Sequence, residues 1–340
     1  MNEELLNPIN ERIEEQMKPF KFTREILNEM ENVFLKNDKY NRATVKIVIK
    51  DNKMEYIRDT SATDIRVTNM IEMFKKMYDY VIKNKKKLLD CTIYVFTLDV
   101  YTYEYQHLPF FVRSRPSNRT GILIPDESFV MNDIKGVNVD WDQTKDIIKS
   151  NCNLEKYDKI NKLYFRGSNA GGDKHNLRKL LEKERKFNTF YDITIGQYYV
   201  PFYEGCKYKY LLNLPGQQPW STRFKYLLLM KSLVIHVGLI QHFEYSTNTS
   251  WHTFYSILYK KGVDYISIKY DWYENDAEKN KKSLNKLVNE IRETYVYYED
   301  NPDAYDKIVE SAYKKVNMMS LDIVYESLFM VINEYAKKFN

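Results

Sequence analysis

Residues 163–181 read LYFRGSNAGGDKHNLRKLL, an apolar run that passes through glycines into a helix-like pattern. A strand, a glycine-containing loop and a helix form a phosphate cradle in α/β proteins, because backbone N–H groups and the helix N-terminus point at the anion. Gly167 and Gly172 have the spacing of a Walker loop, but Lys174 comes one residue late and no hydroxyl follows it. One residue turns a side chain by about 100° around a helix. We therefore expect a phosphate-binding turn that is not a working Walker loop, with an ordinary glycine turn as the alternative.

Strands and helices alternate on the C-terminal side of this stretch. Apolar runs predict strands at 163–167, 190–196, 207–214, 232–238 and 264–270. Helical patterns lie between them at 174–187, 220–231 and 251–260. Such alternation predicts a doubly wound, mainly parallel sheet, in which ligands bind at the carboxyl ends of the strands.

The N-terminal part is less regular. Its first forty residues are amphipathic and helical, residues 43–57 predict a strand or hairpin that turns at Asp51-Asn52, and a helix over 66–88 precedes a strand over 91–99. We expect an α/β protein with two units facing across a cleft. The expected domains are residues 1–158 and 159–316, followed by a C-terminal helix at 317–340 that packs back on the first.

The composition is that of a soluble globular protein. The 340 residues are 44% hydrophobic and 29% charged, and 52 basic against 47 acidic residues give a net charge of +5. The charges are well mixed, so they do not indicate nucleic-acid binding, and no apolar run reaches the roughly 18 residues that a membrane span needs. The abundance of Tyr, Lys and Asn suits AT-rich coding, as in a large DNA virus or an AT-rich microbe.

The cysteines and the N-terminus predict a cytoplasmic protein. Cys91, Cys152 and Cys206 are an odd number and lie in or beside apolar sequence, which favours buried free thiols in a reducing compartment. The first twenty residues have no apolar core of a signal peptide, and the chain ends in KKFN without a retention signal.

A second informative stretch is YKYLLNLPGQQPWSTRFKYLLLMKSLVIHVG, residues 208–238. Ser221 or Thr222 can cap the helix that follows the loop, which places Arg223 in the first helical turn. A cation is electrostatically unfavourable there, because the helix N-terminus already carries partial positive charge. A bound anion resolves the conflict by meeting the exposed N–H groups, the Ser221 hydroxyl and the Arg223 guanidinium together. An arginine that extends into solvent is the alternative.

The two stretches together resemble glycosyltransferase family 90, the capsule-associated and protein O-glucosyltransferase family. Its members show an F-R-G-S turn, a K-Y-K-Y-L-x-N-x-x-G strand and loop, an S-x-R-x-K-Y-L-L helix and an S-L-V strand. The resemblance covers residues 163–271 well, closes with GVDYISIKYD, and extends more weakly over 92–129.

The resemblance implies a GT-B architecture of two Rossmann-like domains, with an acceptor-side domain at 1–158 and a UDP-sugar-binding domain at 159–316. It also implies a UDP-sugar donor and inverting transfer without a bound metal or cofactor. Arg178 or Lys174 would supply a further phosphate contact, with Arg178 preferred. The donor-binding residues that the family motifs imply are Arg166, Gly167, Ser168, Arg178, Gly216, Gln217, Trp220, Ser221, Thr222 and Arg223.

The resemblance also implies a catalytic aspartate after a buried strand. YVFTLDVY, PFFVRSR and ILIPDESF stand in the family's order and place the general base at Asp99, with Asp126 as the fallback. The R-D-x-P context of the animal enzymes is missing around Asp99. A strand-end acid that caps a turn is the structural alternative.

No metal site is expected. Asp140-Trp141-Asp142 matches the D-x-D of metal-using transferases, but it does not follow an apolar strand and is interpreted as a helix-start acidic pair. His236 lies in an apolar strand and is expected in the core, whereas His242 or His252 could line the cleft.

The sequence therefore predicts an inverting, metal-independent glycosyltransferase that moves glucose or xylose from a UDP-sugar to a hydroxyl of a glycan or protein. Two alternatives remain open. One is a non-catalytic UDP-sugar-binding relative, and the other is a nucleotide-dependent kinase or ATPase with an atypical phosphate loop. A nucleic-acid binder is more distant.

Overall fold

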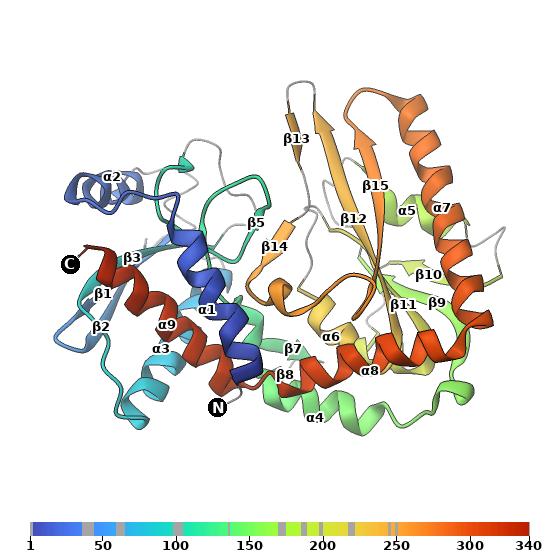
Figure 1. Ribbon diagram of the computed structural model, residues 1–340, viewed down its shortest axis with the longest axis horizontal. Coiled ribbons are helices and arrows are strands. Elements are labelled where there is room, and N and C mark those ends of the chain that lie inside the picture. Colours follow the sequence, from blue (N-terminus) through green and yellow to red (C-terminus); the bar gives the residue numbers. More distant parts are fainter. Residues whose placement is uncertain are drawn as a thin grey trace.

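The computed structural model describes residues 3–35, 44–58, 65–97, 105–134, 137–168, 175–184, 189–196, 200–216, 222–243, 246–248 and 251–339. The described residues form two α/β halves that lie side by side, each built on its own sheet (Figure 1). The chain returns to the first half at its C-terminal end, so both termini lie on that half (Figure 1).

The first half consists of short strands and four helices within the described ranges. They are α1 (Glu3–Met17), α2 (Arg24–Leu35), β1 (Thr44–Lys50), β2 (Lys53–Arg58), α3 (Ile65–Lys83), β3 (Cys91–Phe96), β4 (Phe111–Val112), β5 (Ser114–Pro116), β6 (Ile122–Leu123), β7 (Asn132–Ile134), β8 (Val137–Val139) and α4 (Trp141–Asn151). The main sheet has the order β2-β1-β3-β4-β6.

The predicted hairpin over 43–57 is confirmed in its described part as β1 and β2. Asp51 and Asn52 form its two-residue turn with φ of 50° and 57°, the left-handed conformation that Asp and Asn tolerate best among non-glycine residues. The sheet is mixed, because β2-β1-β3 pair antiparallel whereas β3-β4-β6 pair parallel. This half is therefore α/β and less regular, as predicted, but its mixed sheet departs from the Rossmann-like domain that the family resemblance implied.

The second half is built on a parallel sheet. Its elements are β9 (Ile160–Gly167), α5 (Leu177–Glu184), β10 (Tyr191–Ile195), β11 (Tyr208–Asn213), α6 (Phe224–Leu228), β12 (Leu233–Phe243), β13 (Ser246–Asn248), β14 (Trp251–Thr253), β15 (Ile266–Tyr273), α7 (Ala277–Asp300) and α8 (Pro302–Met318). The last helix, α9 (Leu321–Phe339), returns to the first half (Figure 1). The sheet order is β10-β9-β11-β12, with β15 parallel to β12 and β13 antiparallel to it. The five strands predicted from apolar runs are confirmed.

Two expected helices in this half are wrong in extent or type. The helix over 220–231 is the five-residue α6, which ends before Lys231, a residue with φ of 49°. The stretch 251–260 forms β14 and then a short 3-10 helix, η6 (Phe254–Leu258). β14 pairs antiparallel with β5 of the first half, and such a long-range pairing leaves no signal in the local periodicity.

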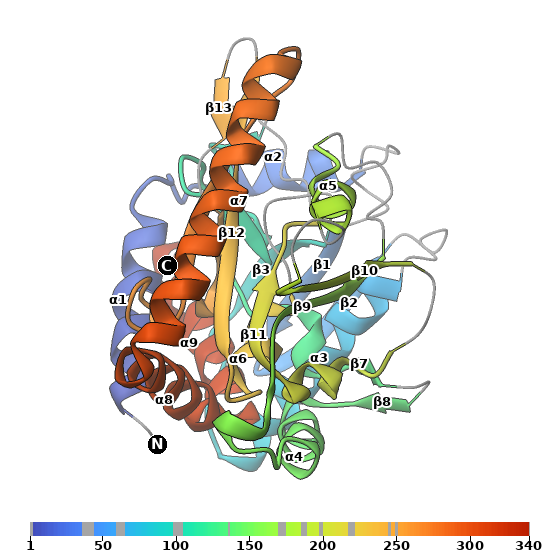
Figure 2. The same cartoon turned by 90° about the vertical axis from the view of Figure 1, so that its right-hand side faces the viewer.

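The second sheet is covered by helices on both faces. One face of β12 and β15 places Val237, Leu239, Ile268 and Tyr270 in a core with Leu287 of α7, and α7 runs along these strands (Figure 2). The other face shares a core with the first half, which includes α3 and α9 residues. The two halves are therefore packed on a common hydrophobic core.

Several contacts join the halves at specific points. β14 pairs with β5, and Lys225 of α6 forms a buried ion pair with Asp126, with 3.0 Å between Nζ and Oδ1. After the chain crosses back, α9 packs within the first half against α1 and α3, where the Tyr80 hydroxyl donates to Glu326 over 2.9 Å.

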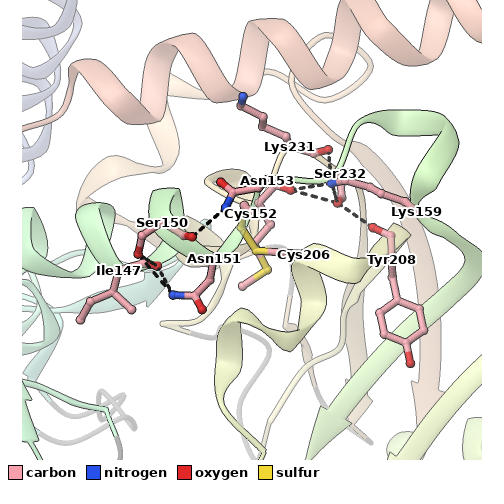
Figure 3. Close-up of a disulfide and its surroundings, with 11 residues drawn as sticks. Ile147, Ser150, Asn151, Cys152, Asn153, Lys159, Cys206, Tyr208, Lys231 and Ser232 are labelled. Carbon is pink, nitrogen blue, oxygen red and sulfur yellow. Dashed lines mark hydrogen bonds between the residues drawn. A yellow bond between two sulfur atoms is a disulfide. The ribbon is translucent and has the colours of Figure 1, made fainter.

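The prediction of free thiols is wrong for two of the three cysteines. Cys152, which caps the end of α4, is joined by a disulfide to Cys206 in the 3-10 helix η5 (Phe202–Lys207), and their Cα atoms are 5.1 Å apart (Figure 3). Cys91 is free, and burial raises the pKa of its thiol to about 12. The two bonded cysteines are 54 residues apart, so only the fold brings them together.

Candidate active site

A cavity of about 460 Å³ opens at the carboxyl ends of β9, β10 and β11. This is the edge at which open α/β sheets bind ligands. Its described lining residues are Tyr164, Phe165, Arg166, Gly167, Ser168, Thr194, Gly196, Val200, Phe202, Leu212, Arg223, Tyr226, Leu227 and Met230. Four of the predicted donor residues thus share one cavity: Arg166, Gly167, Ser168 and Arg223.

Arg223 lies at the N-cap position of α6, half-buried between the cavity and the protein interior. Its guanidinium stacks over the ring of Phe165, 4.6 Å from the centroid. Burial and the neighbouring Arg178 lower the pKa of Arg223 to about 10. Because α6 has only five residues, the helix dipole contributes little, and the positive potential comes from the two guanidinium groups.

Arg178 connects the two loops that the family motifs define. Its Nε donates to the Pro215 carbonyl and its Nη1 donates to the Ser168 carbonyl, each over 2.9 Å. The side chain is 7% exposed and lies 5.4 Å from the Phe165 centroid. Arg178 therefore fixes the Ser168 turn against the Pro215 loop while adding positive charge beside Arg223.

Gly167 allows these groups to approach one another. A Cβ atom at this position would lie 3.0 Å from the Phe165 ring and 3.3 Å from Nη2 of Arg223. A side chain would therefore crowd both the ring and the guanidinium that stacks on it, which explains a glycine in the F-R-G-S turn in packing terms.

His175 positions the second loop and was missed by sequence reasoning. It is 3% exposed, its Nδ1 accepts from the Leu177 N–H over 3.2 Å, and its Nε2 therefore donates to the Gly216 carbonyl over 3.0 Å. Gly216 was predicted as a donor-binding residue, and the structure shows how its backbone is held. Only the position of His175 just before a helix could have indicated this role.

Arg166 is tied to the neighbouring strand. It donates to the Asp192 carboxylate over 2.6 Å and to the Asp192 carbonyl over 2.7 Å, and its guanidinium lies 4.7 Å from the Tyr164 ring centroid. Burial alone would raise the pKa of Asp192, but hydrogen bonds from Tyr208 and Arg166 lower it. Arg166 thus lines the cavity and also fixes β9 to β10.

Several predicted residues cannot be placed. Asp99, Lys174, Gln217, Trp220 and Ser221 lie outside the residues that the structure describes. Thr222 lies in the turn that leads into α6 and is half-buried.

Asp126, the fallback base, lies in a structural ion pair. It is 2% exposed, caps the 3-10 helix η3 (Glu127–Phe129) through the Ser128 N–H, and accepts from Lys225 Nζ over 3.0 Å. Burial lowers the pKa of Lys225, although Asp126 opposes that shift. Asp126 does not line either of the two cavities beside α6, an arrangement that favours a role in joining the two halves.

The Asp-Trp-Asp stretch begins a helix, as predicted. Asp140 caps α4 in a capping box with Gln143, and Asp142 accepts from the Leu321 N–H over 3.2 Å. In the described ranges no group of three or more His, Cys, Asp or Glu side chains is arranged to hold a metal ion. None of the described helices combines the length and the apolar character of a membrane span.

A second cavity of about 440 Å³ lies on the other side of the start of α6, where Phe224 forms part of its wall. His236 and His252 both line it, so one of the two later histidines does face a cavity. His236 is deep in the protein but partly accessible from this cavity, and burial lowers its pKa to about 4. No motif in the sequence indicates this second cavity.

A parallel sheet with arginines gathered at its carboxyl edge is an arrangement with which α/β proteins bind anionic ligands. The family model of glycosyl transferase family 90 matches residues 9–340. The chain therefore belongs to glycosyl transferase family 90, which confirms the resemblance seen in the sequence.

Relatives from animals support this placement. Human protein O-glucosyltransferase 1 is 26% identical over 212 residues, which cover 58% of this chain and 47% of the human protein. An O-glucosyltransferase rumi homolog of Aedes aegypti is 25% identical over 213 residues, covering 58% of this chain and 46% of that protein. O-glucosyltransferase rumi of Drosophila melanogaster is 40% identical over 70 residues, 21% of this chain and 14% of its own length. The chain spans about half the length of the first two relatives.

The prediction of a cytoplasmic protein is wrong. These relatives are O-glucosyltransferases and contradict it. The disulfide between Cys152 and Cys206 also removes the cysteine argument on which the prediction rested, since disulfides persist in oxidising compartments.

Proposed function

We propose that the protein transfers a glucosyl or xylosyl group from a UDP-sugar to a hydroxyl of a glycan or protein acceptor. The transfer inverts the anomeric centre, needs no metal ion, and uses a GT-B-like arrangement in which the two halves contribute acceptor and donor sites. Family membership supports the reaction class, and the names of the relatives support glucose.

The observation that carries the proposal is the position of Arg223. Arg223 is half-buried at the N-terminal end of α6 and lines the first cavity together with Ser168. The guanidinium of Arg178, which donates to the Ser168 carbonyl, lies beside it. Two neighbouring cations in a partly desolvated site favour a bound anion such as a diphosphate. Arg223 would take up the charge that develops on the leaving UDP, with Ser168 and Ser221 as further donors, and Arg178 would hold the two loops in place.

The chemical step is a single displacement. The acceptor oxygen forms a bond to the anomeric carbon, the bond from that carbon to the diphosphate oxygen breaks with its electron pair, and the acceptor proton passes to Asp99. Inversion follows because attack and departure occur on opposite faces of the sugar.

A panel of nucleotide sugars tests the reaction. UDP release is measured with UDP-glucose, UDP-xylose and UDP-N-acetylglucosamine, each with and without EDTA. ATP turnover in the presence of Mg²⁺ is measured in parallel. We expect release from UDP-glucose or UDP-xylose that EDTA does not change, and an inverted product by NMR. Abolition by EDTA, or turnover of ATP alone, would overturn the proposal.

Two variants test the roles of the residues. Arg223→Lys keeps a charge but loses the bidentate guanidinium, so we expect the Kd of UDP to rise about tenfold or more by calorimetry. Arg58→Lys on the exposed β2 is the matched control and should leave it unchanged. Asp99→Asn should lower transfer by about 10²-fold without weakening UDP binding. Wild-type transfer by Asp99→Asn would remove Asp99 from the mechanism.

A further inference from the structure

Three residues that line the second cavity carry buried polar atoms without a hydrogen-bond partner. Asn213, Trp251 and Tyr259 line this cavity, and Asn213 Oδ1, Trp251 Nε1 and the Tyr259 hydroxyl have no hydrogen-bond partner among the described residues. Asn213 is 1% and Tyr259 5% exposed. A buried polar group without a partner retains the full cost of its desolvation, so three of them around one cavity indicate a polar ligand.

His236 adds a fourth polar group of known orientation. Its Nδ1 accepts from the Asn213 amide over 2.8 Å, so the ring proton is on Nε2. Nε2 is 4.0 Å from the position that a Cβ of Gly238 would occupy, and both residues line the cavity. Because burial keeps the pKa of His236 near 4, the ring is neutral at physiological pH and offers one N–H donor.

No acidic side chain is among the described residues that line this cavity. The two lysines among them, Lys261 and Lys269, are exposed. Aromatic rings form much of the wall, among them Phe224, Trp251 and Tyr265. A neutral ligand with apolar faces and polar edges suits such a cavity.

The four polar groups come from different elements. Asn213 ends β11, His236 lies in β12, Trp251 begins β14, and Tyr259 follows η6. A nucleobase presents its polar atoms along a limited edge, whereas a pyranose carries hydroxyl groups around its perimeter and C–H groups on its faces. The distribution therefore favours a sugar ring over a base.

We propose that the second cavity binds a neutral hexopyranose ring, with Asn213, Trp251 and Tyr259 as residues that determine sugar specificity. The ring is that of the donor or of a saccharide acceptor, since both offer the same chemistry. The inference rests on the proposed function for the identity of the donor. The first cavity, across the start of α6, then receives the nucleotide part.

Calorimetry on the full chain with UDP, UDP-glucose and methyl β-glucopyranoside tests this assignment. Tyr259→Phe removes only the hydroxyl, and Gly238→Val fills the cavity from a strand position where the added Cβ meets its nearest neighbours at 3.8 and 4.0 Å. Tyr335→Phe, which removes a buried hydroxyl that donates to Thr92 in the first half, is the control.

We expect both cavity variants to bind UDP as the wild type does. Tyr259→Phe should weaken the sugar ligand about threefold to tenfold, and Gly238→Val more. Loss of UDP-glucose affinity identifies the donor's sugar as the occupant, and loss of methyl glucoside affinity alone identifies an acceptor sugar. Unchanged affinity for both sugar ligands, or an equal loss for UDP itself, would overturn the proposal.

The same measurements distinguish a wrong proposed function from a wrong assignment of the second cavity. If wild-type protein does not bind UDP, the donor identity is wrong, whereas the methyl glucoside measurements still report on the cavity.

Discussion

The disulfide between Cys152 and Cys206 gives a prediction whose size follows from the chain length that it encloses. Its cysteines are 54 residues apart. For a loop of that length, loop-closure entropy predicts a loss of about 14 cal/mol/K in the unfolded chain, or about 4 kcal/mol at 25 °C. The double variant Cys152→Ser/Cys206→Ser should therefore lower the free energy of unfolding by about 4 kcal/mol.

Non-covalent contacts near the disulfide remain in that variant. Lys159 Nζ donates to the carbonyls of Met230 and Lys231 over 2.8 and 2.6 Å, and to the Ser232 hydroxyl over 2.8 Å (Figure 3). These hydrogen bonds hold the start of β9 to the turn that follows α6. The double variant should therefore still fold. Its lower free energy of unfolding should reflect the greater entropy of an unfolded chain that has no cross-link.

Urea unfolding followed by tryptophan fluorescence measures the effect, with Cys91→Ala as the control that leaves the loop closed. Alkylation of the unreduced, denatured wild type should modify one of the three cysteines, and all three after reduction. A loss below about 1 kcal/mol in the double variant would refute the entropic reasoning. Three reactive thiols without reductant would refute the disulfide itself.

Two further predictions concern buried charge. Asp126→Asn should lower the free energy of unfolding by about 3–5 kcal/mol, because it leaves the Lys225 ammonium buried without its counter-ion. As a control, Glu278→Gln at an exposed ion pair on α7 should change the free energy of unfolding in urea by less than about 0.5 kcal/mol. A small effect of Asp126→Asn on stability together with a large effect on transfer would instead favour a catalytic role for Asp126. The pKa of His236 is lowered to about 4 in the folded state, so the unfolded state binds its proton first as pH falls, and stability should decline between about pH 6.5 and 4 by up to about 1.4 kcal/mol per unit. Urea midpoints of wild type and His236→Gln across that window measure it, and equal slopes would contradict the assignment.

The strands of the second half were predictable because each is a short apolar run bounded by turn residues. The start of α8 has a similarly local cause, since Pro302 occupies its first helical position. The hairpin at Asp51-Asn52 was fixed by its turn chemistry. In these cases the information is local, and local periodicity or turn propensity carries it.

The errors concern features that depend on distant parts of the chain. β14 looked like the start of a helix because its pairing with β5 joins segments from different halves. The disulfide and the second cavity likewise draw on segments far apart in sequence. Arg223 was placed by a helix-dipole argument, and its site is instead dominated by burial and by Arg178.

The start of α6 explains how the site and the docking of the two halves depend on each other. Arg223 lines the first cavity and Phe224 the second. Lys225 forms the buried ion pair with Asp126, and the Tyr226 hydroxyl donates to the Ser128 carbonyl over 3.1 Å. Successive residues at the start of one short helix therefore contact two cavities and the other half of the protein. Since a five-residue helix has little stability of its own, the contacts of Lys225 and Tyr226 with the first half help to hold the helix that follows Arg223.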